Sequence, residues 1–339
     1  MVFRRSLTTV GALLSVSSAT PLQKRDYPPA GACEGVCEGR LHDPAVIYNE
    51  ATSEYWRFTT NDGIGMAVAP SISGPWTYRG AALPNGSSID LPGNRDLWAP
   101  DVLKHKDIYY LYYSVSEMGS SNSDIGVAAS GSLDAGEWVD YGSIGIPQSP
   151  YYNRIDGNLF THDPDNLAMS FGSFWDNIFQ LPMEDPPIRV VDHGKIRHLA
   201  MNNTVRGQGL VDRAQEGPYL FFWQGWHYLF VSAGNCCNEA DDLAPPGEEY
   251  HIMVCRSKEQ WGNFVDKEGR DCFTGGTMVL NSHGDVYAPG GQGVMWDPNL
   301  QSVVMYYHYV RPSVSYDYDR FYFGWNKLDF SSGWPVVIE

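Results

Sequence analysis

Four short motifs, each carrying one acid, recur along this chain at a period of about 55 to 75 residues. Each motif lies roughly ten residues before an aromatic-rich segment that has the character of a strand. A fifth such segment, 302–309, follows Ala288-Pro289-Gly290-Gly291, where no acid occurs. Self-similarity at this period indicates a radial repeat such as a β-propeller, in which equivalent positions of successive blades meet at one axis. The four acids are Asp43, Asp101, Asp156 and Glu216.

The composition supports the same fold class. Aromatic residues make up 14% of the chain, while 35 glycines and 22 prolines supply many turns. No long amphipathic helical pattern is present. We therefore predict an all-β fold, a five-bladed β-propeller, with three recognisable strands in each blade. The strands are expected at 45–48, 55–60 and 65–70; 102–104, 108–115 and 124–129; 159–161, 167–171 and 178–181; 219–223, 228–232 and 251–256; 293–297, 302–309 and 321–325.

The first 25 residues have the pattern of a secretory signal. Arg4 and Arg5 give a basic start, 10–16 a short apolar core, and Lys24-Arg25 a dibasic processing site. The apolar run is too short to span a membrane. We predict a signal peptide and pro-segment at 1–25, a single propeller domain at 26–339, and a secreted, extracellular protein.

The charge bears on the partners. The formal net charge is −17, and removal of residues 1–25 leaves 19 bases against 40 acids, or −21. Such a surface repels phosphate backbones, so we expect no nucleic acid and no membrane as partner. A soluble monomer that acts on a neutral polymer fits this charge.

Six cysteines in a secreted chain predict structural disulfides. Cys33 with Cys37 and Cys255 with Cys272 are the pairings we consider, which would leave Cys236-Cys237 as a vicinal pair; other connectivities stay open. None of the spacings is that of a zinc site. The sequons Asn85-Gly86-Ser87 and Asn202-Asn203-Thr204 predict glycosylated surface loops.

An acid at the start of an innermost strand lies at one mouth of the central channel. Several such acids can divide a hydrolytic task, one as base for water, one as acid, and one to tune its neighbour's pKa. The alternative is that these aspartates are turn residues only, since Asp favours turns. Their common offset in successive repeats speaks for the chemical interpretation.

The motifs resemble those of glycoside hydrolase family 43, the five-bladed propeller glycosidases, and within it the fungal, secreted endo-α-1,5-L-arabinanases. The likeness covers roughly residues 40–335. It rests on a set of short segments in a fixed order: Leu41-His42-Asp43-Pro44, Gly63-Ile64-Gly65-Met66-Ala67, Gly74-Pro75-Trp76-Thr77-Tyr78, Leu97-Trp98-Ala99-Pro100-Asp101-Val102, Tyr109-Tyr110-Leu111-Tyr112-Tyr113-Ser114, Ile155-Asp156-Gly157-Asn158-Leu159, Gly172-Ser173-Phe174-Trp175 and Glu216-Gly217-Pro218-Tyr219.

The resemblance implies an inverting glycosidase. Asp43 takes the place of the general base and Glu216 that of the general acid. Asp156 takes the place of the third carboxylate, which modulates the pKa of the acid and orients it. Inversion needs the acid and base about 6.5–9.5 Å apart to admit a water, a separation that opposite sides of a channel can provide. Asp101 lies outside the family's trio, and we expect it to bond backbone or line the cleft.

Further residues are candidates for binding the substrate. Trp98, Phe174 and Trp175 could offer faces to furanose rings, although packing between blades is an equal alternative for Trp175. Asn158 and Ser173 could bond sugar hydroxyls.

One departure concerns a metal. Many arabinanases have a Gly-Pro-Gly-His turn in the last blade, whose histidine helps to hold a metal; here Gly291 stands at the place of that histidine, before Gln292. We therefore predict no required cofactor and no metal ligands, and we doubt a calcium or sodium ion in the channel. His42 and His308 could reach the channel, but a lone histidine is more often structural.

The sequence thus predicts a secreted enzyme that cleaves internal α-1,5 bonds of arabinan with inversion. An exo-acting arabinofuranosidase or xylosidase of the same family, or a carbohydrate-binding propeller without catalysis, are the alternatives. The absence of zincin, nucleophile-elbow, dinucleotide and P-loop motifs excludes the corresponding chemistries.

Overall fold

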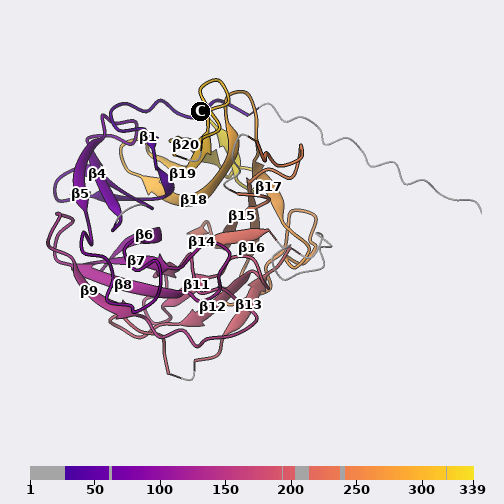
Figure 1. Ribbon diagram of the computed structural model, residues 1–339. Coiled ribbons are helices and arrows are strands. Elements are labelled where there is room, and N and C mark those ends of the chain that lie inside the picture. Colours follow the sequence, from indigo (N-terminus) through magenta and orange to yellow (C-terminus); the bar gives the residue numbers. More distant parts are fainter. Residues whose placement is uncertain (1–26, 61–62, 193, 203–213, 237–240, 318) are drawn as a thin grey trace, which may run out of the picture.

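The computed structural model describes residues 27–60, 63–192, 194–202, 214–236, 241–317 and 319–339. Within these residues the chain forms 21 β-strands and no helix, and hence none that could cross a membrane. Five antiparallel sheets are arranged around a common centre (Figure 1). The predicted five-bladed β-propeller is therefore confirmed.

Each of the first four blades is a four-stranded meander. Blade one consists of β2 (His42–Asn49), β3 (Glu54–Thr60), β4 (Gly65–Ala69) and β5 (Thr77–Ala81). Blade two consists of β6 (Trp98–His105), β7 (Ile108–Val115), β8 (Asp124–Ser130) and β9 (Val139–Ser143). Blade three consists of β10 (Asn158–Phe160), β11 (Ala168–Phe171), β12 (Ile178–Pro182) and β13 (Arg197–Ala200). Blade four consists of β14 (Gln215–Trp223), β15 (Trp226–Ala233), β16 (His251–Ser257) and β17 (Thr277–Leu280).

Blade five closes the ring with both ends of the described chain. Its main strands are β18 (Tyr287–Asp297), β19 (Ser302–Val310) and β20 (Phe321–Asp329), and its outer edge is made by β1 (Glu38–Gly39) together with β21 (Val336–Ile338). The innermost strands β2, β6, β10, β14 and β18 contact one another in turn, and β18 returns to β2. Radial closure of this kind leaves only short sheet edges.

The hydrophobic core is divided among the blade interfaces. Five clusters of buried side chains each join one blade to the next, as Trp56 and Phe58 of blade one join Leu111 and Tyr113 of blade two. Burial of such side chains contributes about 1.5–3 kcal/mol each. Repeated aromatic strands therefore hold the blades together, as the composition indicates.

The outermost strands were missed from the sequence. β5 and β9 are only five residues long and carry exposed side chains such as Tyr78 and Val139. Each pairs with only one neighbour, so its alternating pattern is weak. The sheet, rather than the local sequence, decides that these segments are strands.

Both disulfide pairings that we considered are present. Cys33–Cys37 closes a loop in the N-terminal segment, and Cys255–Cys272 joins β16 to the loop that precedes β17. Cys236 is also disulfide-bonded, while Cys237 lies outside the described residues. The predicted segment 1–25 and most of the second sequon also lie outside them; Asn85 of the first sequon is exposed.

A two-residue bulge near the start of the innermost strand recurs around the ring. In blades one, two, four and five it interrupts the pairing with the second strand, so that two residues of the inner strand have no partner opposite. The first bulge residue has a positive φ, and blade three has such a residue just before β10. These residues are Asp43 (44°), Ala99 (44°), Asp156 (58°), Gly217 (58°) and Gly291 (56°). Bulges redirect side chains, and here they point toward the axis.

Candidate active site

A cavity of about 280 Å³ lies where the first residues of the innermost strands meet. Residues from all five blades line it, from Asp43 of blade one to Tyr306 of blade five. Asp43, Asp156 and Glu216 are all among its walls, as are Trp98, Phe174 and Trp175. The propeller thus brings together carboxylates that are 60 or more residues apart in sequence.

The four acids do not occupy equivalent positions, which corrects the expectation of a common offset. Asp43 is the left-handed first residue of its bulge, and Asp156 is the left-handed residue just before β10. Glu216 precedes the left-handed Gly217, and Asp101 follows the left-handed Ala99 by two positions. Side chains at different positions of a bulge leave the strand in different directions. Asp43 and Glu216 occupy different positions, and both carboxylates line the same cavity.

The Asp43 carboxylate is held in its ionised form. Its Oδ2 accepts hydrogen bonds from His42 Nδ1 at 2.8 Å and from Thr60 Oγ1 at 3.3 Å. Burial raises the pKa of Asp43. The charge and hydrogen bond of His42, together with His308 and Thr60, outweigh this rise and lower the pKa to about 2. Its side chain is 23% exposed, to the cavity, and the Oδ1 oxygen packs against Gly291. An ionised, accessible carboxylate can accept a proton from water.

Glu216 is bound at both oxygens. Ser173 Oγ donates to Oε2 at 2.5 Å, and Tyr250 OH donates to Oε1 at 2.8 Å. Burial raises the pKa of Glu216, the two hydrogen bonds oppose that rise, and the charge of Asp43 adds to it; the net direction is upward. Sequence analysis did not find Tyr250, because it lies in the loop just before β16 (His251–Ser257) and no local pattern relates it to the acid.

Asp156 lies beside Glu216 and shares its titration. Burial raises the pKa of Asp156 well above its ordinary value, and the charges of Glu216 and Asp43 raise it further. Its Oδ2 accepts the N–H of Gly217 at 3.1 Å, directly after Glu216 in the chain. Asp156 and Glu216 therefore titrate as a pair of like charges that retains a proton more readily than a single carboxyl does.

Asp101 and Asn158 lie in the cavity wall and form hydrogen bonds between blades. Asp101 Oδ2 accepts the N–H of Leu159 at 2.9 Å and the side-chain amide of Asn158 at 3.2 Å. Asn158 Oδ1 in turn accepts the N–H of Leu220 at 2.9 Å. Both side chains are buried. The amide nitrogen and the amide oxygen of Asn158 each form a hydrogen bond within the protein. Burial raises the pKa of Asp101 to about 7, against the hydrogen bonds from Leu159 and Asn158.

A strained loop presents two aromatic rings to the cavity. Phe174 and Trp175 have φ values of 50° and 47°, a region costly for side-chain-bearing residues. The loop is fixed because Phe174 N–H donates to Gln215 O at 3.0 Å, and Asn177 Nδ2 donates to the carbonyls of Phe174 and Gln215. Trp98 lines the same cavity and is partly exposed. Ser173 is buried and its hydroxyl is engaged by Glu216.

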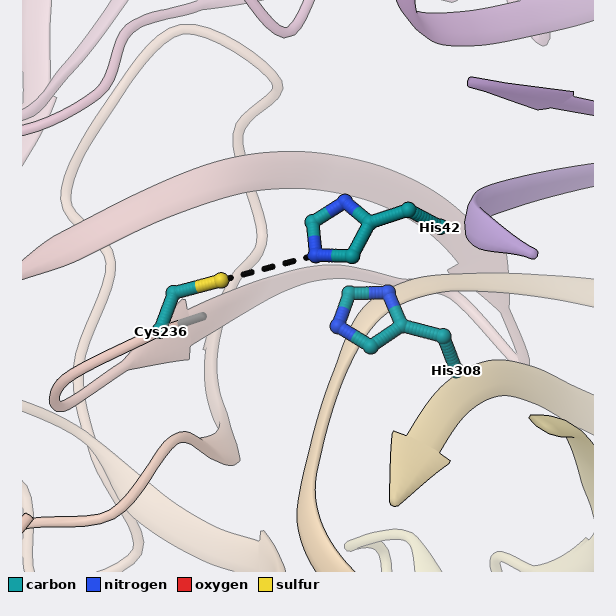
Figure 2. Close-up of side chains that lie close together, drawn as sticks. All are labelled: His42, Cys236 and His308. Atoms are coloured by element: carbon teal, nitrogen blue, oxygen red, sulfur yellow. Dashed lines mark hydrogen bonds between the residues drawn. The ribbon is translucent and has the colours of Figure 1, made fainter. Parts of the chain in front are cut away.

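The residues near the last blade do not form the expected kind of metal site. A Cβ at Gly291 would lie 2.3 Å from Asp43 Oδ1 and 2.6 Å from His308 Nδ1, so no histidine fits at this position. Gln292 instead accepts a bond from Ser232 Oγ and donates to Gly217 O. His42, Cys236 and His308 lie close together (Figure 2), but the sulfur of Cys236 is in a disulfide and is no thiolate ligand.

One carboxylate that is held ionised and a pair that retains a proton, in one cavity, suit general acid–base hydrolysis, and glycoside hydrolases use such carboxylates. The model of the family Glycosyl hydrolases family 43 matches residues 34–335. The chain belongs to glycosyl hydrolase family 43.

Relatives cover nearly the whole chain. It is 49% identical over 314 residues to the probable arabinan endo-1,5-α-L-arabinosidase A of Emericella nidulans, across 92% of this chain and 94% of that protein. It is 48% identical over 330 residues to the arabinan endo-1,5-α-L-arabinosidase A of Aspergillus niger, across 96% and 99%. The structure of the α-L-arabinanase of Cellvibrio cellulosa complexed with arabinohexaose is similar at a TM-score of 0.75 and 26% identity, across 88% of this chain and 95% of that one.

Proposed function

We propose that this protein is an endo-1,5-α-L-arabinanase that hydrolyses internal α-1,5-L-arabinofuranosidic bonds of arabinan with inversion. The observation that carries this proposal is the cavity in which Asp43 is held ionised while the Asp156–Glu216 pair retains a proton. The near full-length identity to arabinan endo-1,5-α-L-arabinosidases supports the choice of substrate.

Asp43 is the general base. Its Oδ1 receives a proton from a water molecule, and the oxygen of that water attacks the anomeric carbon. His42 and Thr60 bind Oδ2, so they fix the carboxylate plane and leave Oδ1 for the water. A base with a pKa of about 2 is ionised throughout the acidic range.

Glu216 is the general acid. It transfers its proton to the glycosidic oxygen as the bond to the anomeric carbon breaks, so the leaving sugar departs as an alcohol. Tyr250 and Ser173 orient the carboxyl group through its two oxygens. Asp156 holds the backbone at Gly217, and its charge opposes loss of the proton from Glu216.

Aromatic faces place the sugar between these groups. Phe174 and Trp98 lie in the cavity wall, and furanose rings stack their C–H faces on such rings. Asn158 and Ser173, which we expected to bind substrate, both line the cavity. In addition, Ser173 holds the acid and Asn158 joins three blades.

The protein acts as a secreted monomer without a required cofactor, with residues 26–339 as one catalytic domain. The disulfides Cys33–Cys37 and Cys255–Cys272 fit an oxidising compartment.

Product analysis on linear, debranched arabinan tests the proposal. We expect early products to be a spread of oligomers, and proton NMR of the first product to show an inverted anomeric configuration. Arabinose alone from the first time points would identify an exo-acting enzyme. Binding of arabinan without any product would identify a carbohydrate-binding propeller.

A further inference from the structure

A ring of hydrogen bonds joins the left-handed residues at the innermost strands of the five blades. In each blade, the N–H of this residue, which begins a bulge in blades one, two, four and five and lies just before β10 in blade three, donates to a side chain of the preceding blade. The five bonds are Ala99 N–H to Thr60 Oγ1 at 2.9 Å, Asp156 N–H to Ser114 Oγ at 3.0 Å, Gly217 N–H to Asp156 Oδ2 at 3.1 Å, Gly291 N–H to Ser232 Oγ at 3.0 Å, and Asp43 N–H to His308 Nδ1 at 3.1 Å. These hydrogen bonds fix the left-handed residue of each blade to the preceding blade.

His308 is the exceptional member of the ring. The other four acceptors are oxygen atoms, whereas His308 supplies an imidazole nitrogen from β19, opposite Gly290. Its link closes the circle from blade five to blade one and ends on Asp43, the carboxylate that we assign as base. The side chain of His308 is fully buried.

The imidazole of His308 also packs against His42 and Tyr250, two residues that bind the Asp43 and Glu216 carboxylates. One face stacks on His42, with centroids 3.9 Å apart and planes inclined by 23°. Tyr250 is parallel to it within 11° at 5.8 Å. His42 donates to Asp43, and Tyr250 donates to Glu216. A change in the position of His308 therefore reaches the base through both its backbone and its carboxylate.

The hydrogen bond to Asp43 fixes the tautomer of His308. Nδ1 accepts a proton and so carries none, and burial, followed by the charge of His42, lowers the pKa of His308 well below its ordinary value. The single ring hydrogen is then on Nε2, which is buried and has no hydrogen-bond partner among the residues described. An Nε2–H cannot ligate a metal, so the cluster in Figure 2 offers neither a free imidazole lone pair on His308 nor a thiolate on Cys236.

We propose that His308 is a positioning residue for the general base, with a neutral imidazole that accepts the N–H of Asp43 through Nδ1, and that it holds no metal. This inference rests on the proposed role of Asp43. A non-glycine residue at φ 44° is strained and persists only where its surroundings fix it. His308 supplies that constraint by a hydrogen bond to the strained residue and by stacking on His42, which binds its carboxylate.

Two variants separate positioning from packing. In His308→Asn the side-chain oxygen occupies the place of Nδ1 and still accepts the N–H of Asp43. In His308→Gln the amide reaches the place of Nε2 and leaves that N–H without an acceptor. We expect His308→Gln to lower kcat by about 10- to 100-fold with KM changed less than about twofold, since small misplacements of a catalytic group have effects of this size. His308→Asn should retain most of the wild-type kcat.

Thermal unfolding of both variants is the control. Equal losses of kcat in His308→Asn and His308→Gln, with a similar fall in unfolding temperature in both variants, would overturn the proposal. His308 would then be a packing residue. If Asp43→Asn kept wild-type activity, the assignment of the base would fail instead, so the two failures are distinguishable.

The tautomer can be measured directly, with His308→Asn used only to assign the signal. In long-range ¹⁵N–¹H correlation spectra of ¹⁵N-histidine-labelled protein, the imidazole that is missing from His308→Asn should be protonated on Nε2 only in the wild type, between pH 5 and 7. The same signal should be unmoved by calcium or sodium, and elemental analysis of the purified enzyme should find no metal in stoichiometric amount. A His308 signal that shows protonation on Nδ1, or that calcium shifts, would overturn the proposal.

Discussion

Blades one and five share a backbone frame but carry different side chains at its most constrained position. Asp43 and Gly291 are both left-handed first residues of a bulge, and their N–H groups make equivalent ring bonds. Asp43 projects a carboxylate into the cavity, while Gly291 has no side chain and lies against that carboxylate. The backbone conformation is thus shared by the blades. Whether a blade contributes a carboxylate to the cavity from its left-handed position depends on which residue stands there.

Blade two shows a third use of the same frame. Ala99 fills the left-handed position with a methyl group, and the acid of this blade, Asp101, comes two residues later. There it accepts bonds from Leu159 and Asn158, although it also lines the cavity. An acid in a repeated motif is therefore catalytic or structural according to its place in the bulge.

The largest effect on kcat should come from replacing Asp43, the left-handed residue of blade one. We expect Asp43→Asn to lower kcat by up to about 10⁴-fold on arabinan and to remain as damaging with activated aryl arabinofuranosides, because the water still needs a base. Azide, which needs no base, should restore turnover of the aryl substrate and yield an azide of inverted configuration. A rescued azide of retained configuration would show that another group forms a glycosyl-enzyme and that Asp43 is the acid/base of a retaining mechanism, which would contradict its assignment.

Glu216→Gln should be nearly as damaging on the polymer but selective. With arabinan, whose leaving group is a poor one, kcat should fall by about 10²–10³-fold because proton transfer is lost. With a dinitrophenyl glycoside, which leaves without a proton, the loss should be below about tenfold. Equal losses on both substrates would remove Glu216 from the role of acid; unchanged substrate binding in calorimetry is the control for folding.

Gly291→Ala tests the empty position of blade five. A Cβ would collide with Asp43 Oδ1 and His308 Nδ1 at a φ of 56°. We expect the free energy of unfolding to fall by about 1–3 kcal/mol and kcat to fall by about tenfold or more. Gly284→Ala is the matched control, since φ is 49° and nothing lies within 4 Å of the added Cβ. It should lose stability through strain alone and keep its activity; a similar loss of activity in both would show that strain, not the collision, disturbs the base.

Asp156→Asn tests the filled position of blade three. Its amide oxygen can still accept the N–H of Gly217, so the backbone stays fixed, but the negative neighbour of Glu216 is gone. Because repulsion between carboxylates is mutual, the pKa of Glu216 should fall and the basic limb of the pH–activity profile should move to lower pH, by on the order of one unit. A basic limb that does not move, with unfolding unchanged, would leave Asp156 as an orienting group only.

The fold and the members of the cavity were predictable from the sequence because aromatic strands and acid motifs repeat along it. The bulge positions were harder to predict, since we aligned the motifs on their acids. Alignment on Pro44, Pro100 and Pro218, which all follow a left-handed residue, would have shown that Asp101 is displaced. Proline suits this place because a bulge residue has no ladder partner for an N–H.

Contacts between blades could not be predicted. Tyr250, just before β16, lies 34 residues from Glu216, and His308 of β19 lies 265 residues from Asp43. Only the folded propeller brings each side chain near its carboxylate. A weak signal did exist for the ring of hydrogen bonds, because Ser114 and Ser232 are polar residues near the ends of strands that are mostly aromatic and aliphatic. Polar residues at such positions need a partner, which another blade supplies.

The smallest effect on activity should come from blade two. Asp101→Asn keeps an oxygen for the N–H of Leu159, so kcat should stay within about threefold of the wild type. Its effect should appear in stability instead. Burial raises the pKa of Asp101 to about 7, so its contribution is fully present below the unfolded value near 4 and is lost as pH rises through 7.

Asn does not titrate, so the difference in unfolding temperature between variant and wild type should change with pH. We expect Asp101→Asn to be no more stable than the wild type at pH 4 but more stable at pH 8, where the wild type must ionise a buried carboxyl group. Calorimetric scans of both proteins at pH 4, 6 and 8 measure this. Curves that run parallel across that range would show that Asp101 is ionised in the folded protein, with its charge stabilised by Leu159 and Asn158.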